Sequence, residues 1–242
     1  MELPFNLINA LLAFGIAVSG ALLQGSVGFG LGLVGVPLLV LIDPVFVPGP
    51  LLLGAFLLNL FIFNREQKAI NFKDVAWAVP GRVLGAVSGA LVLSFLPKDH
   101  LSFLFGAMVL LAVGITLVGL DFAAVPRNIF VAGTLSGFMG TTSAIGGAPM
   151  ALVFQKHKGP RIRGTLSVIF AIGTVISMVS LLIIGRFGLR EIQASLVLFP
   201  GIWVGFFISR YTARILDRGF IRTTALITAA LSGVLVILDN FI

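Results

Sequence analysis

Two glycine-rich stretches of the chain carry polar side chains that could bind a small anion. The first covers residues 25–37 and reads GSVGFGLGLVGVP, with Gln24 directly before it and Ser26 inside it. The second covers residues 137–149 and reads GFMGTTSAIGGAP. Its polar side chains, counting the residue just before it, are Ser136, Thr141, Thr142 and Ser143. All of them are neutral hydrogen-bond donors, which suits the oxygen atoms of an oxyanion.

The glycines of these stretches predict that a helix is interrupted in an apolar region. Their spacing is too dense and irregular for one packing face, whereas Gly81, Gly85 and Gly89 fit close helix packing better. Irregular backbone at membrane depth is tolerated only inside protein or beside a cavity, so each break marks a cavity. A half helix that begins there would direct its free N–H groups and its positive dipole end at a bound anion. Phe29 flanks the first break and either caps the cavity or packs elsewhere, like most of the 22 phenylalanines.

The elements that must position these residues are membrane-spanning helices. The 242 residues are 58% hydrophobic and 10% charged, and their mean hydropathy is +1.14. Apolar runs of about 20 residues suit bilayer-spanning helices, so the fold class expected is an all-α polytopic membrane protein. The net charge of +7 comes from basic residues between these runs. We therefore expect the lipid bilayer, and no nucleic acid, as the partner of this charge.

The chain contains an internal repeat. An offset of 112 places Gly25 on Gly137, Gly28 on Gly140 and Pro37 on Pro149. An offset of 120 places PGRVLGAVSG, residues 80–89, on PGIWVGFFIS, residues 200–209. Paired broken segments in two repeats indicate the binding site of a transporter. The full apolar spans cover about residues 47–64, 75–96, 101–120, 162–184, 190–209 and 223–240.

The basic residues decide between two membrane topologies. If both glycine-rich segments, about 5–41 and 129–154, cross fully, the basic residues divide nine to six between the two sides. If both dip in and return, twelve fall on one side and three on the other, which orients the chain clearly. We therefore predict six spanning helices plus two re-entrant segments, arranged as inverted repeats over residues 1–120 and 121–242. The basic loops would be cytoplasmic and both termini outside, although the first segment also fits one crossing plus a half helix.

Arg82 is the one ionisable residue well inside a predicted span, and every Asp and Glu lies near a loop or a terminus. An intramembrane arginine is a candidate binding residue, so Arg82 is assigned to an anion site. The alternative is that its side chain extends to the interface, about 10 Å away at helical rise. Asn59 lies in another apolar span and either lines the same cavity or forms a helix-to-helix hydrogen bond.

Catalysis and metal binding have no support in the residue pattern. The chain has no cysteine, and no nucleotide-binding or metalloprotease motif occurs in it. No Asp, Glu, His or Cys lies in the middle of a predicted span, where it could hold a metal inside the membrane. We expect neither an enzyme, nor a cofactor, nor a metal site.

The segments QGSVGFGLGLVGVPLL and SGFMGTTSAIGGAPMAL, together with the repeated PGxxxG, resemble the TauE/SafE sulfite exporter family, also called the four-toluene sulfonate uptake permease family. The resemblance extends over the whole chain and implies a carrier of the bacterial inner membrane for sulfite, sulfonates or related anions. Typical members carry a tighter glycine cluster before each proline than GLGLVGVP and SAIGGAP. The cavity positions that the resemblance implies are Gly25, Gly28, Gly30, Gly137, Gly140, Gly146 and Gly147.

The leading hypothesis is a secondary transporter that exports sulfite or a small organosulfonate by alternating access. One repeat would move against the other around an anion held between the two broken segments near the midplane. The alternatives are an anion channel, a permease for another small organic anion, and a membrane scaffold in which the glycines serve only packing. The many Phe and Gly residues suit a monomer or a homodimer equally.

Overall fold

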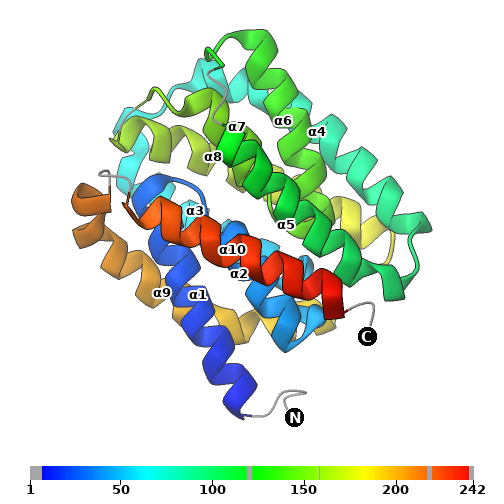
Figure 1. Ribbon diagram of the computed structural model, residues 1–242. Coiled ribbons are helices and arrows are strands. Elements are labelled where there is room, and N and C mark those ends of the chain that lie inside the picture. The colour runs from blue at the N-terminus through cyan, green and yellow to red at the C-terminus, as the bar shows by residue number, and fades with distance from the viewer. Residues whose placement is uncertain (1–6, 119–121, 158, 217–219, 240–242) are drawn as a thin grey trace.

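The computed structural model of the chain describes residues 7–118, 122–157, 159–216 and 220–239, and all of the regular secondary structure in these ranges is helical (Figure 1). The predicted all-α polytopic fold is therefore confirmed. Three short 3₁₀ turns connect the α-helices at Pro44–Phe46, Gln67–Ala69 and Lys98–His100. The α-helices are α1 (Leu7–Val27), α2 (Leu31–Ile42), α3 (Gly49–Glu66), α4 (Phe72–Phe95), α5 (Leu101–Val118), α6 (Pro126–Ser143), α7 (Gly147–Phe154), α8 (Gly159–Ile183), α9 (Leu189–Leu216) and α10 (Phe220–Asp239).

Both predicted breaks are confirmed. The first separates α1 from α2, and its Gly28 and Gly30 have φ angles of 102° and 133°, a region that glycine adopts without a steric penalty. The second separates α6 from α7, and its left-handed residue is Ala144, at φ 61°. The Ala144 N–H bonds back to the carbonyl of Gly140 and closes the end of α6.

The six predicted spans each contain one helix: α3, α4, α5, α8, α9 and α10. Four helices of the described residues are long and apolar enough to cross a bilayer: Leu7–Val27, Phe72–Phe95, Gly159–Ile183 and Leu189–Ala213. Because the first of these is α1, the first glycine-rich segment fits one full crossing followed by a shorter helix, as well as a hairpin. The re-entrant topology and the sidedness stay predictions, and Arg218 and both termini lie outside the described residues.

Each broken segment packs against a long helix of the other half of the sequence. The helix before the first break, α1, lies along α9, and the helix before the second break, α6, lies along α4. Figure 1 shows these pairs on opposite sides of the molecule. The two halves are therefore interlocked.

Glycines permit the close approach in both pairs. A Cβ atom added to Gly81 or Gly85 of α4 would lie 2.2 or 1.9 Å from a carbonyl oxygen of α6. A Cβ added to Gly201 or Gly205 of α9 would lie 2.5 or 2.3 Å from a carbonyl oxygen of α1. Such distances leave no space for a side chain, so the predicted packing role of Gly81 and Gly85 is confirmed, as is that of Gly89.

The helix pairs have the symmetry of a two-fold repeat. Exchanging α1 to α5 with α6 to α10 turns the pair α1–α9 into α6–α4, and α3–α9 into α8–α4. The pairs α3–α8 and α5–α10 map onto themselves. Two equivalent halves would produce this pattern, and both the division at residue 120 and the inverted orientation of the halves stay predictions.

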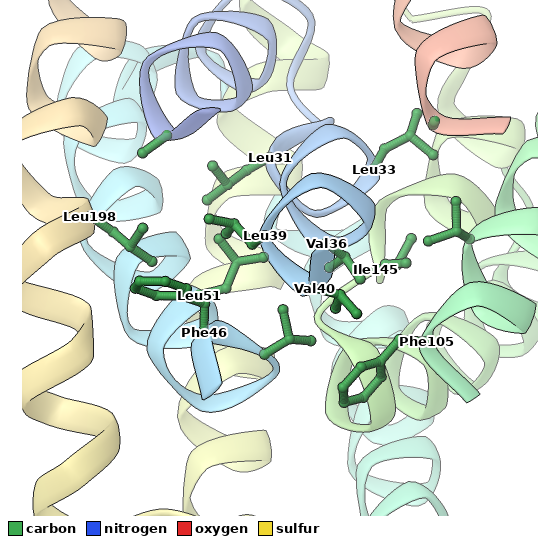
Figure 2. Packing of buried hydrophobic residues seen from close by; sticks show 14 of the residues in the cluster. Leu31, Leu33, Val36, Leu39, Val40, Phe46, Leu51, Phe105, Ile145 and Leu198 are labelled. Atoms are coloured by element: carbon green, nitrogen blue, oxygen red, sulfur yellow. The ribbon is translucent and has the colours of Figure 1, made fainter. Parts of the chain in front are cut away.

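Helix α2 lies in the middle of the core. It is apolar all round, and Leu41 near its C-terminal end is its one exposed residue, as expected of a helix largely enclosed by protein. Figure 2 shows Leu31 and Leu39 on the side of Phe46 and Leu51. Val36 and Val40 point the opposite way, toward Ile145 and Phe105 (Figure 2). The start of α2, next to the first break, is thereby packed into a core that includes residues of both halves.

Candidate functional site

A small cavity of about 40 Å³ lies where the two broken segments meet. This space holds roughly three water-sized groups, since one water needs about 10 to 15 Å³ by this measure. No acidic residue is among the described residues that line it. Half of the residues predicted from the sequence line this central cavity: Gln24, Phe29, Gly30, Asn59, Arg82, Gly140, Gly146 and Gly147.

The two breaks touch through their backbones. A Cβ on Gly32, in the first turn of α2, would lie 2.1 Å from the carbonyl oxygen of Ala144 in the second break. A Cβ on Gly147, the first residue of α7, would lie 3.0 Å from the Cβ of Phe29. The N-terminal ends of α2 and α7 therefore both border the cavity, and their first N–H groups have no partner within their own helices.

A chain of amide hydrogen bonds orients Asn59 at the cavity. The Gln24 oxygen accepts from the N–H of Leu31, the first residue of α2, at 3.1 Å. The amide nitrogen of Gln24 then donates to the Asn59 side-chain oxygen at 3.0 Å. Since Asn59 uses its oxygen for Gln24, its Nδ2 must face elsewhere, and this buried nitrogen has no hydrogen-bond partner. Asn59 thus both forms a helix-to-helix hydrogen bond and lines the cavity.

A second chain of hydrogen bonds holds Arg82. Its Nη1 donates to the Ser136 hydroxyl at 2.6 Å, and that hydroxyl donates to the carbonyl of Gly146 in the second break. Ser136 stands 112 positions after Gln24, so the same position of each repeat connects a break to a polar side chain of the cavity. Arg82 Nε has no hydrogen-bond partner, and no ion pair of the described residues involves Arg82.

The fold makes room for this guanidinium inside the protein. Arg82 is only 2% exposed, so its side chain does not extend to the interface. A Cβ on Gly173 would lie 1.7 Å from Arg82 Nε, and one on Gly146 would lie 3.2 Å from Nη1. The guanidinium also lies 5.4 Å from the centre of the Phe170 ring, within cation–π range.

The end of α1 is held by an ion-paired cluster, which we call the clamp: Arg65, Glu66 and Arg163. Glu66 accepts from Nε of Arg65 at 3.0 Å and from Nε of Arg163 at 2.9 Å. Arg65 also donates to the carbonyl of Gly25, and Arg163 to the carbonyl of Ser26 at 3.2 Å. Cations are favourable there because a helix C-terminus carries partial negative charge.

Three leucines separate the cavity from a pocket at the end of the molecule opposite the clamp. Leu52 lines the cavity and packs with Leu93 and Leu181, which line a pocket of about 660 Å³. We call these three the leucine layer. The pocket also holds Arg186, whose Nη1 has no hydrogen-bond partner, and Arg190.

Comparison with known proteins gives one match, to the family described as Sulfite exporter TauE/SafE, over residues 11–236. The chain belongs to the TauE/SafE sulfite exporter family. The predicted resemblance is therefore confirmed, and with it the assignment to a family of membrane transporters. No curated protein and no solved structure matched the chain.

The other predicted residues of this TauE/SafE protein lie behind the cavity wall. The hydroxyls of Thr142 and Ser143 donate to carbonyls of their own helix, and Thr141 pairs with Ser177 at 2.7 Å. Ser136 contacts the cavity wall through Arg82 and Gly146. The remaining four have structural contacts. Gly25 packs on α9, Gly137 packs on α4, and Gly28 forms the first break beside Arg163. The Ser26 side chain bonds to Leu22 and Thr212.

Sequence reasoning missed several residues of the TauE/SafE site. Phe170 and Thr174 line the cavity four positions apart on one face of α8, yet nothing distinguishes them there from packing residues. Gly173 becomes visible only through its contact with Arg82. Arg65 and Arg163 were counted among the basic residues that orient the chain in the membrane, whereas both lie within helices and are largely buried at the clamp.

Residues that could hold a metal are not gathered in the described part of the chain. Across these ranges, no group of three or more His, Asp or Glu residues lies together. The cavity of this TauE/SafE protein instead offers amide, guanidinium and backbone N–H donors, all of which bind anions.

Proposed function

We propose that this TauE/SafE protein exports sulfite or a small organosulfonate, bound in the central cavity near the membrane midplane. The observation that carries this proposal is the pair of buried side chains there with unpartnered donors, Asn59 and Arg82. An unpaired buried charge and an unpaired amide both carry a large desolvation cost. A bound oxyanion would offset both, because it supplies acceptor oxygens and the missing negative charge.

The surroundings of the cavity favour an anion over a cation. The first turns of α2 and α7 border it, with the Leu31 N–H already bonded to Gln24, and both helices contribute the positive ends of their dipoles. With no carboxylate among the lining residues, nothing would neutralise a cation. The volume of about 40 Å³ suits a small oxyanion, and a larger sulfonate would require the cavity to open.

We propose alternating access in which the clamp closes one end of the path and the leucine layer closes the other. The helix pairing favours moving units that mix the two halves, with α1 and α9 in one and α4 and α6 in the other. This refines the expected movement of one repeat against the other. Opening the clamp exposes charged groups to water, and opening the leucine layer exposes apolar groups. Salt therefore affects the first barrier, whereas temperature and cosolvents affect the second.

The driving force for export is the membrane potential acting on the anion. An inside-negative potential favours outward movement of an anion by about 2.3 kcal/mol per charge per 100 mV. We place the protein in the bacterial inner membrane, with the basic loops cytoplasmic and both termini outside, as the distribution of basic residues suggests. The proposal requires no enzyme activity and no cofactor.

Counterflow in proteoliposomes tests this function. Vesicles containing the purified protein are preloaded with unlabelled sulfite, and uptake of labelled sulfite is followed at two membrane potentials. Saturable uptake that sulfonates inhibit, and that Arg82→Leu reduces strongly in folded protein, is expected. Flux without counterflow would indicate a channel. Absence of flux with any sulfur anion or organic anion, in folded wild-type protein, would indicate a scaffold.

A further inference from the structure

A groove of about 710 Å³ opens on the surface between α5, α6 and α7, and it shares no lining residue with the central cavity. These three helices lie together in the upper part of Figure 1. The volume is within the usual range for ligand pockets. Its walls are aliphatic, with Leu111, Val131 and Leu135 each nearly half exposed.

The wall of the groove has space for a larger residue at one position. A Cβ added to Gly114 of α5 would meet no atom within 4 Å. In the repeat, α7 corresponds to α2, but α7 has 8 residues and α2 has 12. At helical rise the difference is about 6 Å of helix, so the element beside the groove is shorter than its counterpart.

The polar residues of the groove come from the first turn of α6. Arg127 is exposed and belongs to the set of twelve basic residues predicted to face the cytoplasm. Its neighbour Asn128 bonds to the carbonyl of Ala123 at 3.0 Å. No acidic residue lines the groove among the described residues, so none of them compensates the charge of Arg127 there. The groove thus combines apolar walls with a positive charge.

We propose that the groove binds an anionic phospholipid. An acyl chain would lie along the walls, while the phosphate contacts Arg127 and the start of α6, where no side chain caps the free N–H groups. Basic pockets between transmembrane helices at the cytoplasmic face bind anionic headgroups in this way. The apolar lining excludes a free inorganic anion as the whole ligand. The proposal rests on the membrane location of the chain and not on what the central cavity transports.

Native mass spectrometry of the purified full chain tests this site. The protein is titrated with phosphatidylglycerol or with phosphatidylcholine, and bound lipids are counted. Arg127→Gln is expected to lower phosphatidylglycerol binding about fivefold, the contribution of one arginine near a membrane surface. It should lower phosphatidylcholine binding less, because the choline cation of that lipid already neutralises its phosphate. The matched control Arg161→Gln removes another exposed arginine outside the groove and should leave both lipids at wild-type levels.

Filling the groove gives an independent test. Gly114→Phe should remove binding of both lipids at this site, because the ring would occupy the space of the acyl chain. Gly15→Phe is its control, since a Cβ on Gly15 of α1 also meets no atom within 4 Å. Unchanged lipid counts in folded Arg127→Gln and Gly114→Phe would overturn the proposal. So would a wild-type dimer that Gly114→Phe converts to monomer without a change in bound lipid, because the groove would then be a protein interface.

Discussion

Replacing Gly173 by alanine would displace the Arg82 guanidinium without removing any polar group. The new Cβ would lie 1.7 Å from Arg82 Nε and 2.2 Å from Cζ, whereas ordinary contacts begin at 3.4 Å. To restore an ordinary contact of 3.4 Å from 1.7 Å, the guanidinium must shift by about 1.7 Å. Gly173 has ordinary helical φ, so alanine fits its backbone and the flexible side chain of Arg82 is what must yield.

The expected cost is one charge-assisted hydrogen bond between Arg82 and the anion. Such a bond contributes about 1.5 to 3 kcal/mol, so the half-saturation concentration for sulfite counterflow should rise roughly 10- to 150-fold. The arginine keeps its charge, and some transport should therefore remain at high sulfite concentration. The assay is counterflow at a fixed membrane potential, with the melting temperature measured on the same preparation to confirm folding.

Gly54→Ala is the matched control in the other half. Gly54 of α3 faces Ile202 of α9 just as Gly173 of α8 faces Arg82 of α4, and its added Cβ would lie 2.4 Å from Ile202 Cδ1. Both substitutions overpack a helix contact, which typically costs about 1 to 3 kcal/mol of stability. Only Gly173→Ala should change the sulfite half-saturation concentration. An equal change in both variants, or none in folded Gly173→Ala, would refute the role of Arg82.

Three further predictions concern the cavity, the clamp and the helix pairs. Asn59→Leu removes the unpartnered donor at similar volume and should weaken sulfite binding by about 1 kcal/mol or more, seen as a higher half-saturation concentration in counterflow. Glu66→Gln leaves two guanidinium groups facing each other and should lower the melting temperature, with partial recovery at high salt because screening reduces their repulsion; a salt-independent loss would contradict this electrostatic account. Gly85→Ala places a Cβ 1.9 Å from a backbone oxygen of α6 and should destabilise the fold by several kcal/mol. Gly114→Ala, with open space around it inside a helix, should keep or slightly raise the melting temperature, because alanine favours a helix more than glycine does.

The breaks were predictable from the sequence because their cause is local. Glycine supplies the positive φ at Gly28 and Gly30, and glycines spaced this densely in an apolar run favour an interrupted helix over a regular packing face. The repeat offset likewise shows in the sequence alone, and the helix pairs have the corresponding symmetry. Arg82 was identified by its rarity as a charge within a span.

The wall of the cavity was predicted less well because it depends on tertiary contacts and on competing hydrogen bonds. Thr142 and Ser143 were expected to face the ligand, but hydroxyls in helices readily bond to carbonyls one turn earlier, as these do. The clamp was missed because Arg65 and Arg163 are 98 positions apart and look like ordinary basic residues at helix ends. Only the folded chain brings both to the end of α1.

The interlocked pairs also set an order for making this protein. The helix α6 meets a partner that precedes it in the chain, since α4 is complete before α6 is synthesised. The first helix, α1, must wait for Gly201 and Gly205 of α9, which are made about 180 residues after it. During this interval the face of α1 that packs on α9 can contact only lipid or an assisting protein. Truncation before α9 would therefore leave α1 permanently without its partner, and we expect quality control in the membrane to recognise such a chain by this helix.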